Sequence, residues 1–304
     1  MNSYKYINPK QFMLSYGVHE GGYYIEPGET IYTWMPDAHG YDSKYNKVAG
    51  SPNPLIGPFL IKGAKPGNTL VINIYSLKPN RESGFASKNF HPNIHNPPLP
   101  LSTRRKDYVL WNIDLLGKNL KPDKKYFPNY EINIPIHSVL GCIGLASKRG
   151  VFYPSIDCGM FGGNMDYPRL TNGTTIYLPI MVEDAFLYLG DGHALQGAGE
   201  ITGNGVEVSC DIEFSIQIKK FYLNYPAGED SEYLFTICNN KPLEKAFRIA
   251  TSEMIKWLTT LYPLNKNQIG ILMGQLVNYE IGNLVSKKYT VACCFPKSTL
   301  LKIK

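Results

Sequence analysis

Two glycine-rich segments near the middle of the chain carry side chains that could bind a metal or move a proton. They are Gly162-Gly163-Asn164-Met165-Asp166 and the run from Gly190 to Glu200. Glycine lets the backbone approach closely and adopt unusual dihedral angles, so such segments can direct several short polar side chains at one point. Either segment alone is more typical of a turn. Their occurrence together favours a binding site.

The residue types in the second segment indicate a metal. Asp191 and His193 are two residues apart, so an extended backbone places both side chains on one face. A carboxylate beside an imidazole suits a divalent metal such as zinc. Glu200 follows after a further turn, and Asp37, with His39 and Asp42 nearby, forms a third candidate cluster. This third cluster is equally well explained as a loop after an edge strand.

Other kinds of site chemistry do not fit the sequence. It contains no G-x-S-x-G elbow, no S-x-x-K motif, no H-E-x-x-H helix and no D-x-D-x-D-G calcium loop. Its six cysteines include no C-x-x-C pair, so we expect reduced and mostly buried thiols. Attack by a metal-assisted water is the simplest remaining chemistry.

Composition limits the partners and the class of fold. With 22 Tyr, 28 Gly and 22 Pro among 304 residues, the chain favours many strands joined by turns. The net charge of +6 comes from scattered lysines, which argues against a nucleic-acid partner. The sequence has no membrane-length apolar run and no signal-like start, so we predict a cytoplasmic protein with no membrane partner.

Periodicity predicts the elements that must position these residues. Strands are expected at 30–34, 69–74, 130–136, 174–182 and 289–295, and a strongly alternating strand with one buried and one solvent-facing side at 206–218. The polar interval 78–107 is expected to be a long surface loop. Apolar residues three and four apart predict a helix from Leu243 to Leu261, and Asn265 with Gln268 resembles the cap of a second helix. We therefore predict a β-rich body at 1–205 and a ββ-α-α-β lobe at 206–304.

An ordered set of motifs resembles the acetamidase/formamidase family over nearly the whole chain, from about Glu26 to the final strand. The motifs are Asp37-Ala38-x-Gly40, Asn53-Pro54-Leu55-Ile56-Gly57-Pro58, Lys62 to Leu70, Gly141 to Ala146, Gly162 to Asp166, Gly173 to Pro179, and Gly190 to Glu200 followed by Glu207.

This resemblance implies a mainly β, jelly-roll-like body with a smaller α/β lobe, α+β overall, in a homodimer. It implies hydrolysis of short linear amides, such as formamide and acetamide, to a carboxylate and ammonia. It also implies dependence on a divalent metal, which we expect to be zinc, with calcium as a candidate second ion.

The resemblance also assigns roles by position. We expect His193, Asp191 and Asp166 to hold the metal. Glu200 and Asp37 are the catalytic candidates, with Glu200 moving the proton. The oxyanion and the substrate are assigned to Gly162, Gly163 and Asn164.

Three positions depart from the usual family pattern: Phe161, Ala198 and Asn278. The family commonly has a polar or imidazole side chain at the first, an aspartate at the second, and an acid in the late helix at the third. These departures leave two alternatives open. One is a non-catalytic homologue that binds a metal or a small amide, and the other is a hydrolase of a substituted or cyclic amide.

Overall fold

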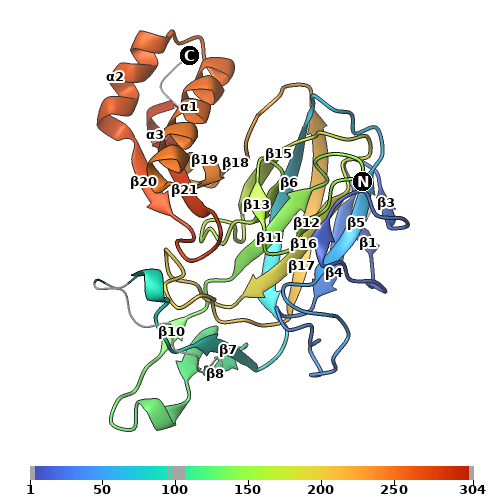
Figure 1. Ribbon diagram of the computed structural model, residues 1–304, viewed down its shortest axis with the longest axis vertical. Helices are drawn as coiled ribbons and strands as arrows, with labels where there is room; N and C mark the ends of the chain where they lie inside the picture. The colour runs from blue at the N-terminus through green and yellow to red at the C-terminus, as the bar shows by residue number, and fades with distance from the viewer. Residues whose placement is uncertain (1–3, 95, 97–106, 301–304) are drawn as a thin grey trace.

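The computed structural model describes residues 4–94, 96 and 107–300, and within them the chain is mainly β, as predicted (Figure 1). The largest sheet has nine strands in the order β1 (Tyr4–Tyr6), β4 (Thr30–Met35), β17 (Cys210–Lys219), β6 (Thr69–Pro79), β15 (Thr175–Pro179), β18 (Ala227–Glu229), β19 (Tyr233–Asn240), β21 (Tyr289–Pro296) and β20 (Asn278–Ile281).

Three smaller sheets accompany it. The six-stranded sheet has the order β13 (Cys158–Gly159), β14 (Gly162–Asn164), β11 (Val139–Leu145), β16 (Leu187–His193), β5 (Leu55–Ile61) and β3 (Tyr23–Ile25). The four-stranded sheet has the order β10 (Ile134–Pro135), β9 (Asn119–Pro122), β8 (Tyr108–Asp114) and β7 (Ser83–Ser87), and β12 (Tyr153–Pro154) pairs with β2 (Ser15–Tyr16).

The helices follow the sheets in the chain. They are α1 (Leu243–Leu261), α2 (Lys266–Leu276) and α3 (Lys297–Leu300), with short 3-10 turns η1 (Pro92–Ile94) and η2 (Lys124–Tyr126). Asn265 caps α2 in a reciprocal capping box with Gln268, as the sequence predicted. No helix in the described ranges is long and apolar enough to cross a bilayer.

The nine-stranded and six-stranded sheets pack face to face around one apolar core. Phe59 on β5 and Phe214 on β17 meet across it, with 5.6 Å between ring centroids. Alternate residues of β6, including Ile72 and Ile74, point into the same core. Burying each such side chain stabilises the fold by about 1.5–3 kcal/mol, so this sandwich is a rigid support for the loops at its ends.

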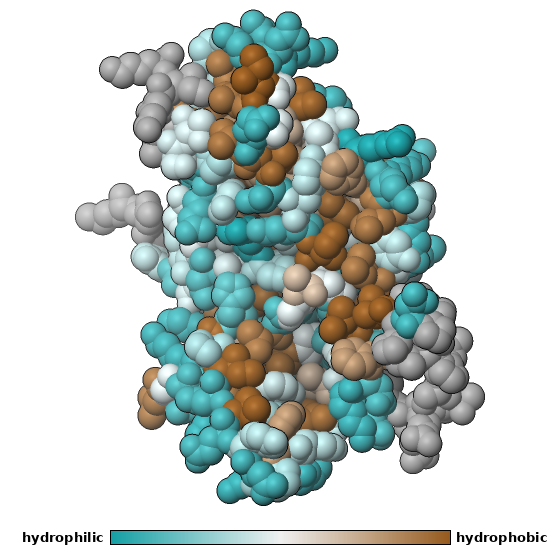
Figure 2. Space-filling view, turned by 90° about the vertical axis from the view of Figure 1, so that its left-hand side faces the viewer, coloured by the Kyte–Doolittle hydropathy of each residue, from teal (hydrophilic) through white to brown (hydrophobic). Residues whose placement is uncertain are grey.

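The helices cover the end of the nine-stranded sheet that contains β19 and β21, at the top of Figure 1. Ala246, Ala250 and Met254 recur on one face of α1 and pack against β19 and β21. Cys293 belongs to this second core and its neighbour Cys294 to the main one, so adjacent residues of β21 point to opposite faces. The face shown in Figure 2 carries brown, apolar groups at the helical end and further down, separated by teal, polar residues.

Several predicted elements need correction. The interval 78–107 is not a plain loop, because it contains the end of β6 and the strand β7, which pairs with β8. Residues 95 and 97–106 of this interval lie outside the described ranges. The sequence of β7 has weak strand propensity, so pairing with β8 decides its structure. The expected strand at 130–136 is reduced to β10, and Asn278 begins β20 rather than lying in a late helix.

The predicted boundary between residues 205 and 206 stays a prediction. In the structure, β17 lies between β4 and β6 in the large sheet, whereas β18 to β21 extend that sheet under the helices.

Candidate metal centre

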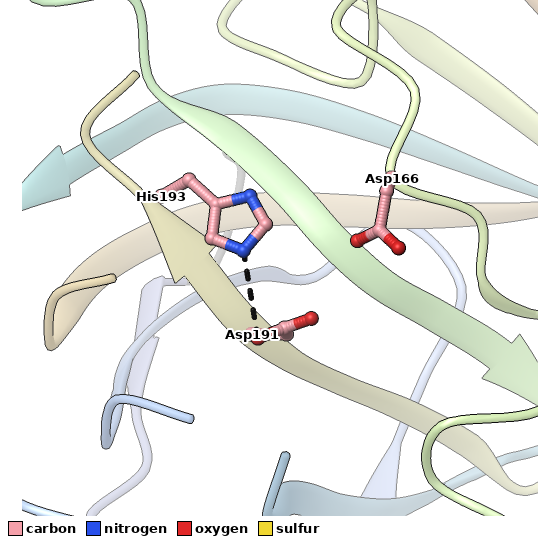
Figure 3. Close-up of side chains that lie close together, drawn as sticks. All are labelled: Asp166, Asp191 and His193. Carbon is pink, nitrogen blue, oxygen red and sulfur yellow. Dashed lines mark ion pairs between the residues drawn. The ribbon is translucent and has the colours of Figure 1, made fainter. Parts of the chain in front are cut away.

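Three predicted site residues meet beside the six-stranded sheet. Asp191 and His193 project from β16, and Asp166 follows β14 in the chain (Figure 3). One ligand-type atom from each lies within 4.8 Å of those of the other two, and His193 Nε2 is 3.5 Å from Asp191 Oδ1. The sequence prediction that Asp191 and His193 share a face is confirmed by this distance.

A second group shares the same imidazole. His193, Glu200 and Glu207 also bring one ligand-type atom each within 4.8 Å of one another. Glu207 Oε1 lies 3.2 Å from His193 Nε2, because residue 207 bridges directly to residue 193. All of these side chains are buried. The chain therefore concentrates four buried carboxylates around one histidine.

The backbone is strained at three of the four carboxylates. Asp166, Asp191 and Glu200 have φ values of 44°, 60° and 48°, in the left-handed region that disfavours residues with a Cβ. Each such residue costs of order 1–3 kcal/mol and persists only where the surrounding structure enforces it. Gly141 on β11 makes room for two of them, since a Cβ there would lie 2.7 Å from both Asp166 Oδ1 and Asp191 Oδ2.

A side-chain amide fixes which nitrogen of His193 faces the carboxylates. Gln196 Nε2 donates to the backbone oxygen of Asp166 at 2.6 Å, so Gln196 Oε1 is the acceptor for His193 Nδ1 at 2.9 Å. Nδ1 therefore carries a proton, and Nε2 faces Asp191 and Glu207. A bare lone pair opposite carboxylate oxygens is repulsive, so the space at Nε2 must hold either a proton or a cation.

Four buried atoms at this point make no hydrogen bond within the described part of the chain: Asp166 Oδ1, Asp191 Oδ1, His193 Nε2 and Glu207 Oε2. Each unpaired buried polar group costs about 1–3 kcal/mol. A divalent cation bound by either candidate ligand group would offset part of this cost, and the nitrogen and oxygen donors fit one.

Crowding changes the protonation of these groups. Burial, followed by the charge of Asp191, raises the pKa of Asp166 to about 7. Burial raises the pKa of Glu207 to about 8 and that of Glu200 well above its usual value, where the nearby Asp166 charge adds to the effect. Burial lowers the pKa of His193, but the Glu207 and Asp191 carboxylates outweigh it and raise that pKa. The centre is short of positive charge.

Amide side chains hold the carboxylates in place. Asn283 Nδ2 donates to Asp166 Oδ2 and to Glu200 Oε2, both at 2.7 Å. Asn53 Nδ2 donates to Asp191 Oδ2 at 2.6 Å, and Asn164 Nδ2 donates to Asp166 Oδ2 at 2.5 Å. Asn164 therefore lies at the site, as predicted, although its amide nitrogen is aimed at a carboxylate.

The centre forms the floor of a cavity of about 750 Å³. Asp166, Asp191, Glu200 and Glu207 all line it. The walls include His39, Phe85, Tyr108 and Ile156, together with small polar residues such as Ser87, Thr202 and Asn204. A ligand entering this cavity meets the acidic groups at the bottom.

Three other predicted site residues lie elsewhere. Asp37 forms a buried ion pair with Arg81 at 2.6 Å and accepts the backbone N–H groups of His39 and Tyr41. Neither candidate ligand group among the described residues includes it. Gly162 and Gly163 lie on β14, which pairs with β11 on one side and β13 on the other, and neither glycine lines the cavity.

The three departures from the family pattern are also away from the cavity. Phe161 packs in an aromatic cluster with Tyr153 and Tyr16, at centroid distances of 4.7 and 5.2 Å. Ala198 and Asn278 are exposed. None of the three lines the cavity, so they do not alter the acidic floor.

Sequence reasoning missed several residues that the structure brings to the centre, among them Asn53 and Gln196, whose side-chain amides contact Asp191 and His193. Glu207 appeared to be on the solvent-facing side of an alternating strand, but it is only 3% exposed. The signal against that interpretation was its place in the family motif directly after the Gly190 to Glu200 segment. Asn283 carries no sequence signal, because it arrives from the β20–β21 connection far along the chain.

The fold and the centre define a class: a mainly β protein with a buried carboxylate and histidine centre at the base of a cavity. Residues 155–248 match the model of the Acetamidase/Formamidase family. The chain is similar to the formamidase of Methylophilus methylotrophus (36% identical over 76 residues, 23% of this chain and 19% of that one). A relative from Schizosaccharomyces pombe is 25% identical over 227 residues, covering 59% of this chain.

The chain thus matches only 19% and 55% of the lengths of these two curated relatives. The crystal structure of an acetamidase from Yersinia enterocolitica superposes over almost all of both chains, 98% of this one and 93% of the other, with a TM-score of 0.83 and 25% identity. Taken together, these matches show that part of the chain is similar to members of the acetamidase/formamidase family and that its fold resembles that of an acetamidase.

Proposed function

We propose that this protein is a metal-dependent amidohydrolase that cleaves the C–N bond of linear primary amides. The observation that carries the proposal is the set of four buried, unpaired ligand atoms on Asp166, Asp191, His193 and Glu207, three of which belong to residues that line an open cavity. Similarity to the acetamidase/formamidase family supports the same reaction, because the similar protein from Methylophilus methylotrophus is named a formamidase.

The metal is assigned to His193, Asp191 and Asp166, and we add Glu207 to this set from its 3.2 Å approach to His193. Zinc is the ion we propose, because it is commonly held by one or more imidazoles together with carboxylates. A divalent metal bound here supplies Lewis-acid polarisation and brings the pKa of water toward neutrality. Calcium as a second ion stays a prediction.

The reaction consumes one water and releases ammonia. A C–O bond forms between water and the amide carbon, the C–N bond breaks, and the proton taken from water reaches the departing nitrogen. Glu200 is the proposed carrier of that proton, because it lines the cavity and is buried, and burial raises its pKa well above the usual value for a carboxyl. Asn283, bound to Glu200 Oε2, orients it.

The first experiment measures ammonia released from formamide, acetamide and propionamide by protein that has been stripped of metal. The protein is then refilled separately with zinc, calcium, manganese or iron. Release that returns with one metal supports the proposal and names the ion. Ammonia release at the full rate from the stripped protein contradicts the role of the metal, and no release in any combination contradicts the hydrolase itself.

We also propose a homodimer, which the family resemblance implies, and retain the predicted cytoplasmic location. Sedimentation of the purified protein at several concentrations tests the homodimer. A mass near that of a single chain at every concentration would contradict it. Fractionation of the source cells tests the cytoplasmic location.

A further inference from the structure

The cavity is much larger than the short amides of the family require. A water molecule occupies about 30 Å³ in the liquid, so the four heavy atoms of acetamide need on the order of 120 Å³. The cavity measures about 750 Å³. Pockets of roughly 300–1,000 Å³ are the size that encloses drug-sized ligands. Most of this cavity would therefore remain filled with water around acetamide.

One wall of the cavity is aromatic. It consists of His39, Phe85 and Tyr108, which we call the aromatic wall. The rings of His39 and Phe85 are stacked at 4.4 Å, and Tyr108 meets both edge to face, at 5.2 and 5.1 Å between centroids. All three line the cavity, and Phe85 and Tyr108 are only partly buried, so ring surface of these two remains available to a ligand.

The aromatic wall is held rigidly. The backbone N–H of His39 donates to Asp37 Oδ1, and the other oxygen of Asp37 pairs with buried Arg81. Tyr108 Oη lies 3.2 Å from His39 Nε2. This explains the position of Asp37 in the fold: its carboxylate supports the aromatic wall. A wall held in this way loses little conformational entropy when a ligand packs on it.

The aromatic wall also adjoins the acidic floor directly. The backbones of Phe85 and Glu207 exchange two hydrogen bonds, at 3.2 and 2.8 Å, so one residue of the wall is paired with one residue of the centre. Two further apolar residues, Ile156 and Val285, line the same cavity. The cavity thus combines a polar, charged floor with an apolar, aromatic side.

We infer that the preferred substrate is a primary amide that carries an aromatic ring, such as an arylacetamide, rather than formamide or acetamide. The inference rests on the proposed function and keeps its reaction: water adds to the amide carbon, the C–N bond breaks, and ammonia and an arylacetate leave. The carboxamide sits at the acidic floor, while its ring packs on Phe85 and Tyr108. Such ring contacts are favourable beyond the area they bury.

The test compares kcat/KM for phenylacetamide and acetamide in metal-loaded protein by measuring ammonia release. We expect the ratio of phenylacetamide to acetamide to be about tenfold or more. In Phe85→Leu the ratio should fall by about tenfold, and Tyr108→Leu provides a second variant if the first does not fold. Phe90→Leu is the matched control, because Phe90 is 53% exposed and does not line the cavity. Its ratio should equal that of the natural protein.

A ratio of about one or less, or a ratio that both wall variants leave unchanged, overturns the inference while the amidase function stands. Absence of ammonia from every amide overturns the proposed function instead. Binding then tests the cavity without turnover, by saturation-transfer NMR with phenylacetone and acetone, the methyl ketones that match the two amides in shape. Binding of phenylacetone that is lost in Phe85→Leu supports an aryl site, and no binding of phenylacetone rejects it.

Discussion

Gln196 should control how tightly the centre binds the proposed metal, although its amide is not one of the proposed ligands. It fixes the proton on His193 Nδ1 and so leaves Nε2 available for coordination. Loss of such a supporting hydrogen bond typically lowers metal affinity by about 10–100-fold. We therefore expect Gln196→Leu to raise the zinc dissociation constant by that factor in a chelator competition. Gln275→Leu, an exposed position on α2, is the control. Equal zinc dissociation constants for the natural protein and both variants would show that Gln196 does not orient His193.

His193→Ala should have the larger effect, because both candidate ligand groups contain this imidazole. We expect the purified variant to contain little zinc by elemental analysis, while His137→Ala keeps the metal content of the natural protein. His137 is a suitable control because it binds the backbone oxygen of Pro168, away from the centre. A full complement of zinc in His193→Ala would return His193 to a purely structural role.

Glu200→Gln separates proton transfer from metal binding. The substitution keeps the size of the side chain and its bond from Asn283, but removes the group that can carry a proton. We expect unchanged zinc content and turnover reduced by roughly 10²-fold or more. Glu213→Gln on β17 is the matched change outside the cavity. Near-normal turnover in Glu200→Gln would assign proton transfer to another group.

At the residue scale, sequence spacing identified most of the centre. Asp191 and His193 could be placed together because local backbone periodicity relates them. Asp166 and Glu200 were found through glycine-rich motifs, which signal the unusual dihedral angles that the structure has at these acids. Asp37 was assigned to catalysis on its motif alone, and the structure pairs it with Arg81. No local pattern shows which distant cation a buried carboxylate will meet.

At the scale of elements, the β20–β21 connection brings the helical end of the molecule into the centre. Asn283 lies on it, and its amide is shared by Asp166 and Glu200. Asn283→Ala leaves both carboxylates without this donor, which should lower the free energy of unfolding by about 1–3 kcal/mol. Turnover should fall as well, because Glu200 loses its orientation. Urea unfolding and ammonia release measure the two effects.

Asn278→Ala is the control for this change, since Asn278 is exposed on the same hairpin. If Asn283→Ala matched Asn278→Ala in both stability and turnover, the connection would be a passive link between strands. A loss of turnover without a loss of stability would still support the orienting role of Asn283.

Elements with strong hydrophobic periodicity were predicted well. Strands that form only by pairing with another strand of the chain were not. The helix from Leu243 to Leu261 was found with its bounds, because its apolar stripe and the following proline are local signals. The strand β7 was missed, since Ser83 to Ser87 forms a strand only through pairing with β8. The alternating run at 206–218 was recognised as β, but its supposed solvent-facing side includes Glu207, which the aromatic wall and the centre cover.

At the scale of the whole molecule, long-range pairing set the limit of prediction. The opposite orientations of Cys293 and Cys294 follow from the geometry of a single strand, which is a local property. The order of the nine-stranded sheet was not predictable, because β17 pairs with β4 and β6, which lie more than a hundred residues earlier in the chain. No local signal specifies such pairings.

An ion-pair network ties the sandwich to its helical end. Arg169, three residues after Asp166, donates to Glu280 on β20 at 2.8 Å and to Asp230 at 2.7 Å. Burial alone raises the pKa of each acid. For Glu280, the hydrogen bonds of Arg169 and Tyr167 reverse this, and for Asp230 the N–H groups of Tyr233 and Glu232 together with Arg169 do so. The pKa of each carboxyl is therefore lowered in the folded protein.

Because of this network, part of the free energy of unfolding should depend on pH. A carboxyl with a lowered folded pKa contributes stability above its unfolded pKa, about 3.9 for Asp and 4.3 for Glu. That contribution is lost as the pH falls through the folded value. In Arg169→Met, removal of the cation raises both folded pKa values and shrinks the contribution. We therefore expect the variant to be less stable than the natural protein at pH 7, and the difference to narrow as the pH falls from about 5 toward 2.

Urea midpoints at pH 7, 5, 4, 3 and 2 measure this, with Arg248→Met, an exposed position on α1, as the control. The control should stay close to the natural protein throughout. A stability difference for Arg169→Met that is the same at pH 7 and pH 3 would show that Arg169 acts through packing, for instance through its contact with the Tyr233 ring at 4.6 Å, since that contribution does not depend on the charge of either acid.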